Sequence, residues 1–585
     1  MIKRITEMHK NDVFFIKKSM AYLHGYKLRL VCSALITLFN LVLDIVQPIV
    51  WGYMIANICQ YEFDKVQYYI LLILIIYILQ SGTSYLRDYS LIYISENIER
   101  NIKVEIYEKL IDSSISVVDN MGEGDLLSRL EGDVGSVSGL FTSQLFNAAI
   151  SIIKVSIISI VVVKVNWIIA VVVITVFPIT YIVMRVFGAK IRNAEGVLRI
   201  SVDRYYSFVQ ETINNIREIK TLDVKDEHRV LFDNIITRNK NLQITLGKIS
   251  ALQNNITIIF DFASQVIIYI VGIKLIIVGD LRVELFIAVA VYAEMMANSL
   301  LEVVEIYPGL QESMVSLERI YVLIDEIENK REEFGDKHID RIESIEFNSV
   351  AFKYPNTNDG VYNIGFEIYS PGEYMIVGES GSGKSTITML LIKLFKCDGG
   401  RIKINGININ EIDEKSMRKC VTVISQEPKL FNMTVLDNLI LGKKIDITEV
   451  RKTCMAVGID DYIQTLEKGY YTQVCNFGDE FSVGQKQKLA IARALLRDSS
   501  VIIFDEATSA LDAESKKLID TIIRKLREKH IVITISHRMD HIEDANLIML
   551  MNKGKVAAYG IHSEMLKNSS IYKELYNAEK MGKEQ

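Results

Sequence analysis

A glycine-rich segment, GESGSGKST, occupies residues 378–386 and has the composition of a phosphate-binding loop. It follows the strand-like run EYMIV and precedes the helix-like run ITMLLIKLF, which is the context that such a loop requires. Glycines let backbone N–H groups turn toward phosphate oxygens, and the start of a helix favours anions. We expect the whole segment to contact nucleotide, with Lys384 on the β- and γ-phosphates and Ser385 on Mg²⁺: Gly378, Glu379, Ser380, Gly381, Ser382, Gly383, Lys384, Ser385 and Thr386.

An acidic motif, VIIFDE at residues 501–506, is the second motif that points to nucleotide chemistry. Its four apolar residues predict a buried strand, and Asp505 emerges at the strand end, where a carboxylate holds Mg²⁺ directly or through water. Glu506 comes next and is placed to orient or deprotonate an attacking water molecule. Together the two motifs predict a P-loop enzyme that hydrolyses a nucleoside triphosphate.

Further motifs narrow the family. The segment FSVGQKQKLAIARALL precedes the Asp505 strand, SALD follows it at residues 509–512, and another strand ends in ISH at His537. Gln426 lies in VISQEPKLF, and Tyr354 lies in FKYP upstream of the loop. The order and spacing of these motifs over residues 341–585 resemble the nucleotide-binding domain of ABC transporters.

The resemblance implies roles for residues around the loop. Tyr354 resembles the aromatic residue that stacks on adenine. Gln426 resembles the glutamine that touches Mg²⁺ and the attacking water and senses the membrane domain. His537 resembles the switch residue that contacts the γ-phosphate. The implied catalytic residues are therefore Glu506, His537 and Gln426, the implied metal ligands are Ser385, Gln426 and Asp505, and the ligands are ATP and Mg²⁺.

The resemblance also implies that some residues of this chain contact the opposite subunit of a dimer. Ser482, Gly484 and Gln485 look like the signature that caps the γ-phosphate of ATP held by the opposite subunit, and Asp512 resembles a contact across the dimer. Ser482 and the Gly484 N–H begin a helix, and they complete a phosphate cage only from outside, because the loop occupies the near side. A second ABC half-transporter, of the same or a different chain, is the expected partner.

The signature departs from the usual family pattern. The family reads LSGGQ where this chain reads FSVGQ, with Val483 in place of a glycine. The preceding stretch, TQVCNFGDE, has Cys475 and Asn476 where the family usually carries glycine and glutamate. Asymmetric exporters often pair an intact catalytic glutamate with an altered signature in one subunit. Homodimer and heterodimer therefore both remain open.

Two chain segments of different character must position these motifs. Residues 342–585 alternate short β-branched runs with helical patterns, which predicts an α/β domain with a largely parallel sheet. A charged connector covers residues 326–341. Residues 1–325 hold six apolar stretches long enough to cross a bilayer, which needs about 20 residues each. The expected fold is a multidomain membrane protein, in which an all-α six-helix transmembrane domain precedes an α/β P-loop NTPase domain.

Several predicted helices continue beyond the bilayer. No proline interrupts residues 68–111, so that helix would be about 65 Å long, roughly twice the hydrocarbon thickness. Basic residues gather before the first span and in the long loops after the second and fourth spans. By the positive-inside rule, both termini, the helical extensions and the ATP-binding domain are cytoplasmic. With a half-sized, Lys- and Ile-rich chain, this predicts a multi-pass protein of a bacterial plasma membrane.

Composition excludes other classes of protein. The 585 residues are 50% hydrophobic and carry a net charge of −6, which argues against nucleic-acid binding. The six cysteines are scattered and form no CxxC pair, so neither a disulfide framework nor a zinc site is expected.

Charged residues inside the predicted spans have two interpretations. Asp44, Lys154 and Glu294 lie at similar depths near the middle of the membrane, whereas Asp261 and Glu302 lie nearer the cytoplasm. They could line an acidic cavity for a cationic or peptide cargo. Alternatively, Asp44 or Glu294 pairs with Lys154 and holds helices together.

The membrane half resembles the exporter-type (type IV) transmembrane domain, and residues 114–134 and 213–222 resemble its cytoplasmic coupling segments. The resemblance implies ATP-driven export of an unidentified amphipathic cargo, such as a peptide, lipid or drug, by alternating access. An importer that uses the same fold and an ATP-gated channel or membrane sensor are the alternative functions.

Overall fold

The computed structural model describes residues 18–354, 359–369, 371–478, 480–507, 511–536 and 542–583. The chain forms two compact units. The first comprises Met1–Lys109 and Glu123–Asp325, and the second comprises Leu110–Gly122 and Glu326–Gln585.

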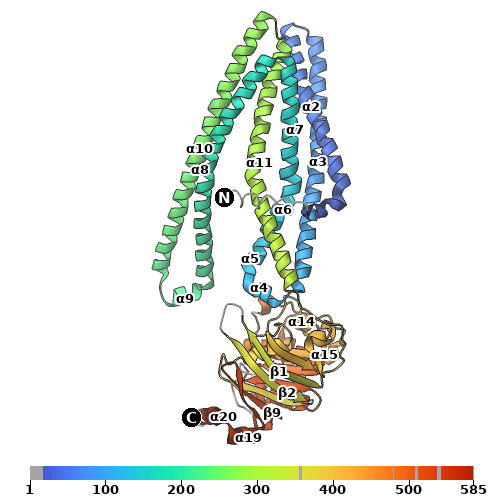
Figure 1. The fold of residues 1–585 in the computed structure, drawn as a ribbon, viewed down its shortest axis with the longest axis vertical. Coiled ribbons are helices and arrows are strands. Elements are labelled where there is room, and N and C mark those ends of the chain that lie inside the picture. Colours follow the sequence, from blue (N-terminus) through green and yellow to red (C-terminus); the bar gives the residue numbers. More distant parts are fainter. Residues whose placement is uncertain are drawn as a thin grey trace. The chain divides into compact units, whose positions relative to one another are not determined.

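Long helices build the first unit (Figure 1). Five helical segments of the described chain are long and apolar enough to cross a membrane, and they contain five of the six predicted spans. The remaining predicted span lies on α8, where many side chains are outside the described residues. The long helices are α2 (Lys27–Cys59), α3 (Phe63–Ile111), α7 (Leu145–Val165), α8 (Trp167–Asn214), α10 (Lys225–Val278) and α11 (Val283–Asn329), with the shorter η1 (Met20–Tyr26), α5 (Glu123–Ser128), η2 (Arg129–Asp133), α6 (Val134–Gly139) and η3 (Leu140–Gln144).

Local signals set the helix ends. Asn166 separates α7 from α8, and its side chain accepts hydrogen bonds from the N–H groups of Ile168 at 2.9 Å and Ile169 at 3.3 Å. This is an N-cap that satisfies free amides of the new helix, and it separates two of the apolar stretches that the sequence predicts as spans. Gly279 ends α10 with a left-handed φ of 89°.

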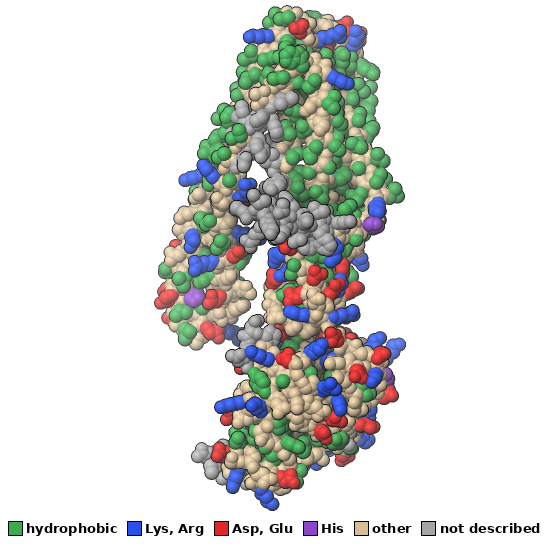
Figure 2. Space-filling model, viewed as in Figure 1, with side chains coloured by type: hydrophobic (Ala, Val, Ile, Leu, Met, Phe, Trp, Pro, Cys, Tyr) green, Lys and Arg blue, Asp and Glu red, His purple; other side chains and the backbone are tan. Residues whose placement is uncertain are grey.

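Helices α8 and α10 run side by side, and the short α9 (Ile216–Thr221) joins their ends (Figure 1). The Phe208 and Phe232 rings lie 6.4 Å apart between them. Within the first unit, hydrophobic side chains dominate the part remote from α9, with a few charged side chains at its tip, and charged side chains become frequent toward α9 (Figure 2). This distribution fits apolar spans that continue into water as polar extensions.

The second unit contains two sheets. A six-stranded sheet has the order β10-β9-β3-β8-β7-β6, in which every pair is parallel except β9 with the edge strand β10. A four-stranded antiparallel sheet has the order β2-β1-β4-β5. The strands are β1 (Ser344–Lys353), β2 (Gly360–Tyr369), β3 (Gly372–Gly378), β4 (Gly399–Ile404), β5 (Ile407–Asn408), β6 (Val421–Ile424), β7 (Val501–Asp505), β8 (Ile531–Ser536), β9 (Leu547–Asn552) and β10 (Lys555–Gly560).

The predicted α/β organisation is confirmed, and the antiparallel sheet adds to it. The main helices of the second unit are α4 (Ile115–Met121), α12 (Lys384–Leu391), α13 (Glu414–Cys420), α14 (Val435–Ile440), α15 (Ile447–Ala456), α16 (Asp460–Thr465), α17 (Val483–Leu495), α18 (Ala513–Leu526), α19 (His562–Asn568) and α20 (Ser570–Lys583). Helix α4 lies in the predicted first coupling segment and is fastened to this unit, because the Ser114 N–H donates to the Lys330 carbonyl at 2.8 Å.

Two apolar cores occupy opposite faces of the six-stranded sheet. Side chains alternate along a strand, so Val501 and Ile503 of β7 join one core, and Ile502 and Phe504 join the other. The first core also contains side chains of α12, and the second contains side chains of α17 and α18. Helix α12 therefore packs on one face of the sheet, and α17 packs on the other.

Candidate functional site

The phosphate-binding loop connects β3 to α12, as its sequence predicts. Gly383 has a φ of +98°, and a Cβ there would lie 2.8 Å from Val361 Cγ1. A Cβ on Gly378 would lie 2.3 Å from the Met551 carbonyl oxygen. Both positions therefore require glycine, and the loop curls tightly ahead of the free amides of α12.

Lys384 is held inside the loop. Its ammonium group donates to the carbonyl oxygens of Gly378 and Glu379, each at 2.9 Å. Burial lowers the pKa of Lys384, and the nearby carboxylates of Glu506 and Asp505 oppose that shift. A buried ammonium group whose partners among the described residues are loop carbonyls suits an incoming phosphate.

Ser385 and Asp505 bring two oxygen ligands together. The Ser385 hydroxyl donates to the Asp505 carboxylate at 3.3 Å, across a sheet in which only β8 separates β3 from β7. Burial raises the pKa of the Asp505 carboxyl, and the Ser385 hydrogen bond opposes that effect. A hydroxyl next to a carboxylate is a donor set that Mg²⁺ prefers, so these residues fit the metal that the sequence implies.

Glu506 follows Asp505 with a strained backbone. Its φ is +49°, a conformation that non-glycine residues rarely adopt, and its N–H donates to the Ile535 carbonyl at 3.0 Å. The Glu506 carboxylate accepts a 2.9 Å hydrogen bond from the Gln426 side chain. Two residues that the sequence assigns to catalysis, 80 positions apart, thus meet beside the loop.

Gln487 links the signature helix to this site, and sequence reasoning missed it. Its side chain is fully buried and donates to the Gln426 carbonyl at 3.2 Å. Among the described residues, its Oε1 atom has no hydrogen-bond partner. The only sequence signal was a second glutamine two positions after Gln485 in FSVGQKQ.

The signature begins α17 with a complete capping box. The Gln485 N–H donates to the Ser482 hydroxyl at 3.2 Å, and the Ser482 N–H donates to the Gln485 side chain at 2.9 Å. Val483 occupies the first helical position, is exposed, and leaves the box intact. Gly484 follows it in the first turn.

Tyr354 lies against the phosphate-loop helix. Its hydroxyl is 3.1 Å from the hydroxyl of Thr386 in α12, and its ring meets the rings of Phe352 and Phe395 edge-on, with centroids 5.0 and 5.5 Å away. The remaining ring surface is where the resemblance implies adenine. Stacking on adenine stays a prediction.

For two residues with predicted roles, His537 and Asp512, the structure does not test the role. His537 lies outside the described residues, as does Ser509 of the SALD motif. Asp512 caps α18 in its own chain, where it accepts from the Ser515 N–H at 2.7 Å. Hydrogen bonds from the Ser515 N–H and the Ser515 hydroxyl lower the pKa of Asp512. Its contact across a dimer stays a prediction.

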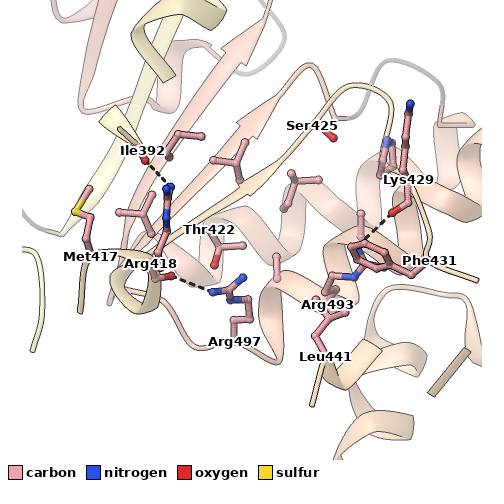
Figure 3. Close-up of a pocket in the computed structure, with 16 residues that line it drawn as sticks. Ile392, Met417, Arg418, Thr422, Ser425, Lys429, Phe431, Leu441, Arg493 and Arg497 are labelled. Carbon is pink, nitrogen blue, oxygen red and sulfur yellow. Dashed lines mark hydrogen bonds between the residues drawn. The ribbon is translucent and has the colours of Figure 1, made fainter. Parts of the chain in front are cut away.

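A separate pocket of about 370 Å³ lies beside the Gln426 segment (Figure 3). Arginine side chains brace its walls. Arg418 donates to the Ile392 carbonyl at 2.7 Å, and Arg497 donates to the Arg418 carbonyl at 2.9 Å. Ser425, which immediately precedes Gln426, lines the pocket, so the pocket adjoins the Gln426 segment.

The membrane unit confirms one interpretation of its charged residues. The Lys154 ammonium and the Asp44 carboxylate form an ion pair at 3.0 Å between α7 and α2. Glu294 is exposed and is not the partner of Lys154, and the side chain of Asp261 lies outside the described residues. Glu302 accepts a 2.7 Å hydrogen bond from the Ser151 hydroxyl, a contact that the sequence did not predict.

Comparisons with known proteins agree with this architecture. Residues 30–300 match the family model described as ABC transporter transmembrane region, and residues 361–509 match the model described as ABC transporter. A putative export ATP-binding/permease protein of Rickettsia typhi is 31% identical, over 86% of this chain and 88% of the relative. An ABC-type oligopeptide transporter of Homo sapiens is 29% identical, over 82% of this chain and 63% of the relative.

A solved structure has the same fold. It is that of a bacterial Atm1-family ABC exporter with ATP bound, with a TM-score of 0.80 and 21% sequence identity. The likeness covers 94% of this chain and 98% of that one. Both units of the present chain therefore have counterparts in one known architecture.

Proposed function

This chain belongs to the ABC transporter family and joins an export-type membrane region to an ATP-binding domain, and from that premise we propose that it exports an amphipathic cargo as half of a dimer. It is a multi-pass membrane protein that couples ATP hydrolysis to transport. The cargo, the identity of the partner chain and the direction of transport belong to the proposal. So does its place in a bacterial plasma membrane, with both termini and the ATP-binding domain in the cytoplasm.

One observation supports the proposal that the chain works as a dimer. Helix α12, which follows the phosphate loop, and the signature helix α17 pack on opposite faces of one sheet. The loop surrounds phosphate from its own side, so the free amides at the start of α17 are available only to nucleotide held by another subunit. Each of two ATP molecules would then lie between the loop of one chain and the signature of the other.

The catalytic roles follow from the local geometry. Loop amides and Lys384 bind the phosphates, and Ser385, Asp505 and Gln426 would hold Mg²⁺, which neutralises charge on the β- and γ-phosphates. Glu506 accepts a proton from the attacking water or orients it, and Gln426 holds the Glu506 carboxylate in place. The resemblance implies that Gln426 also senses the membrane domain, so transport and hydrolysis would share this residue.

Alternating access is the proposed transport cycle. ATP binding would bring two ATP-binding domains together, the coupling segments that contain α4 and α9 would transmit the movement, and the cavity would open outward. Hydrolysis would release the domains and reset the bundle.

Transport in sealed vesicles tests the proposal. Purified chain is reconstituted with its ATP-binding domains outside, and ATP and a fluorescent amphipathic peptide are added externally. Export predicts ATP-dependent accumulation of the peptide inside the vesicles and none with Glu506→Gln. ATP-dependent release of peptide from vesicles preloaded with it would establish an importer, and ion conductance without peptide movement would establish a channel.

A further inference from the structure

A cavity of about 1020 Å³ lies within the membrane unit, between α2, α3, α7, α11 and the segments that precede α7. Its lining combines amide and hydroxyl groups with leucine and isoleucine side chains. Five charged side chains also line it, three carboxylates and two cations: Asp44, Asp88, Glu302, Arg87 and Lys154. Such mixed walls suit a molecule with both apolar and polar parts.

Both cations of this lining already have carboxylate partners. Lys154 pairs with Asp44 at 3.0 Å, and Asp44 also accepts from the Gln80 side chain at 3.0 Å. Arg87 pairs with the adjacent Asp88 at 2.9 Å. A negatively charged ligand would have to break one of these pairs before it met a free cation.

Glu302 is different. Its described hydrogen bond comes from the neutral Ser151 hydroxyl at 2.7 Å, and no ion pair to it exists among the described residues. It lies two positions beyond the apolar window that ends at Leu300, and its side chain is exposed. Within the part of the chain that the structure describes, the cavity therefore holds one carboxylate that has no counter-ion, near the end of an apolar segment.

We propose that this cavity binds an amphipathic cargo carrying a positive charge, and that Glu302 is the counter-ion for that charge. The apolar part of the cargo would lie against Ile150 and Ile306, which flank Ser151 and Glu302 in the lining. An ionised carboxylate at the edge of an apolar region is costly unless it is paired, and a cationic cargo supplies the pair. The proposal rests on the proposed function and deepens it by assigning the cargo class.

Two probes of equal shape and opposite charge test the sign. Tetraphenylphosphonium and tetraphenylborate differ mainly in charge, and their binding to the full chain in lipid nanodiscs is measured by equilibrium dialysis without ATP, with empty nanodiscs subtracted. We expect saturable protein-dependent binding of the cation and not of the anion. Equal binding of both ions, or binding of the anion alone, would overturn the proposal.

Variants at Glu302 test the residue. Loss of a charged interaction predicts that Glu302→Gln weakens cation binding by about tenfold or more, while Glu302→Asp, which keeps the charge, restores part of it. Glu312→Gln removes the same charge from an exposed position of α11 outside the cavity lining, and it should bind like the parent chain. Unchanged cation binding in Glu302→Gln, or an equal loss in Glu312→Gln, would contradict the proposal.

A variant that is expected to bind the cation more tightly distinguishes an electrostatic effect from misfolding, because misfolding would weaken binding. Lys154→Gln removes the partner of Asp44 and leaves a second carboxylate without a counter-ion. We expect it to bind the cation more tightly than the parent chain, and weaker binding by a correctly folded variant would count against the electrostatic account.

Because these binding measurements need no ATP, they do not depend on the activity of the ATP-binding domain. ATPase activity is assayed on the same samples. Absent ATPase activity with intact cation binding would defeat the proposed function alone, and active ATPase without charge-selective binding would defeat this inference alone.

Discussion

At the scale of single residues, the backbone of Glu506, the predicted catalytic residue, is strained. Glu506 is held with a φ of +49° while its side chain accepts from Gln426 at 2.9 Å. Such strain persists only where surrounding contacts enforce it, and here the Ile535 carbonyl and Gln426 do so. These two contacts fix the backbone and the side chain of Glu506 beside Asp505 and Gln426.

Replacing this carboxylate tests its role. Glu506→Gln keeps the size of the side chain and an oxygen that can accept from Gln426, but it removes the proton acceptor. We expect ATP hydrolysis to fall by about 10²–10⁴-fold, the range for loss of a general base, with nucleotide binding retained. Phosphate release and fluorescent-nucleotide titration measure the two quantities. Hydrolysis at the parent rate would refute the assignment.

Gln487 carries a second prediction at this scale. Gln487→Leu removes the hydrogen bond to the Gln426 carbonyl but fills the same buried space. We expect unfolding free energy to change by about 1 kcal/mol or less, because the unpaired Oε1 atom is removed as well. ATPase activity should fall more than stability does, since the Gln426 segment loses its tie to the signature helix. Gln464→Leu, at an exposed glutamine, is the control for thermal unfolding and ATPase assays.

The sequence predicted the loop residues well because their roles depend on local spacing. Gly378 to Thr386 act through a turn between a strand and a helix, and such a turn is encoded in consecutive residues. The Gln487–Gln426 contact spans 61 positions and depends on how α17 packs, which no short motif encodes. For the same reason the sequence left open whether Asp44 or Glu294 pairs with Lys154.

At the scale of elements, the start of α17 explains how an altered signature keeps its geometry. The capping box between Ser482 and Gln485 uses only side chains at the cap and at the third helical position. Val483 lies between them and points toward solvent within the single chain. The amides that would face a partner's nucleotide are therefore presented as in a helix with glycine at this position.

Two variants separate the cap from the altered residue. Ser482→Ala should lower stability by about 1 kcal/mol, the usual cost of losing an N-cap, and should reduce ATPase activity much further. Val483→Gly should leave ATPase activity within about twofold, because glycine in a first helical turn costs at most about 1 kcal/mol. Chemical denaturation and ATPase assays measure both effects. A large gain of activity in Val483→Gly would show that the altered signature weakens the site.

Element types were predictable where periodicity was strong. The break between α7 and α8 followed from polar residues ending at a capping Asn166, and the parallel strands followed from short apolar runs. The antiparallel sheet was not predicted, because it depends on the pairing of β1 with β4, which is distant in sequence. Strand pairing of this kind is set by tertiary packing rather than by local pattern.

At the scale of the whole molecule, the two cores of the ATP-binding unit support the proposal that two chains act together. The sheet separates α12 from α17, and Ser380 in the loop before α12 and Ser482 at the start of α17 are both exposed. The choice between homodimer and heterodimer could not be predicted from sequence, because partner recognition depends on surfaces spread over many helices. An experiment that combines two differently labelled chains is needed to decide between homodimer and heterodimer.

Cross-linking between chains answers it. One chain carries Ser380→Cys and another carries Ser482→Cys, both in a Glu506→Gln background without the exposed Cys32, Cys59 and Cys475. If ATP lies between the loop of one subunit and the signature of the other, oxidation with ATP should give a band of doubled mass, and omission of ATP should abolish it. The double variant in a single chain should likewise cross-link only between molecules, and a disulfide that leaves its mass unchanged would contradict the opposed-face arrangement. Formation of the band by this chain alone establishes a homodimer, whereas a band that appears only with a second half-transporter carrying the matching cysteine establishes a heterodimer.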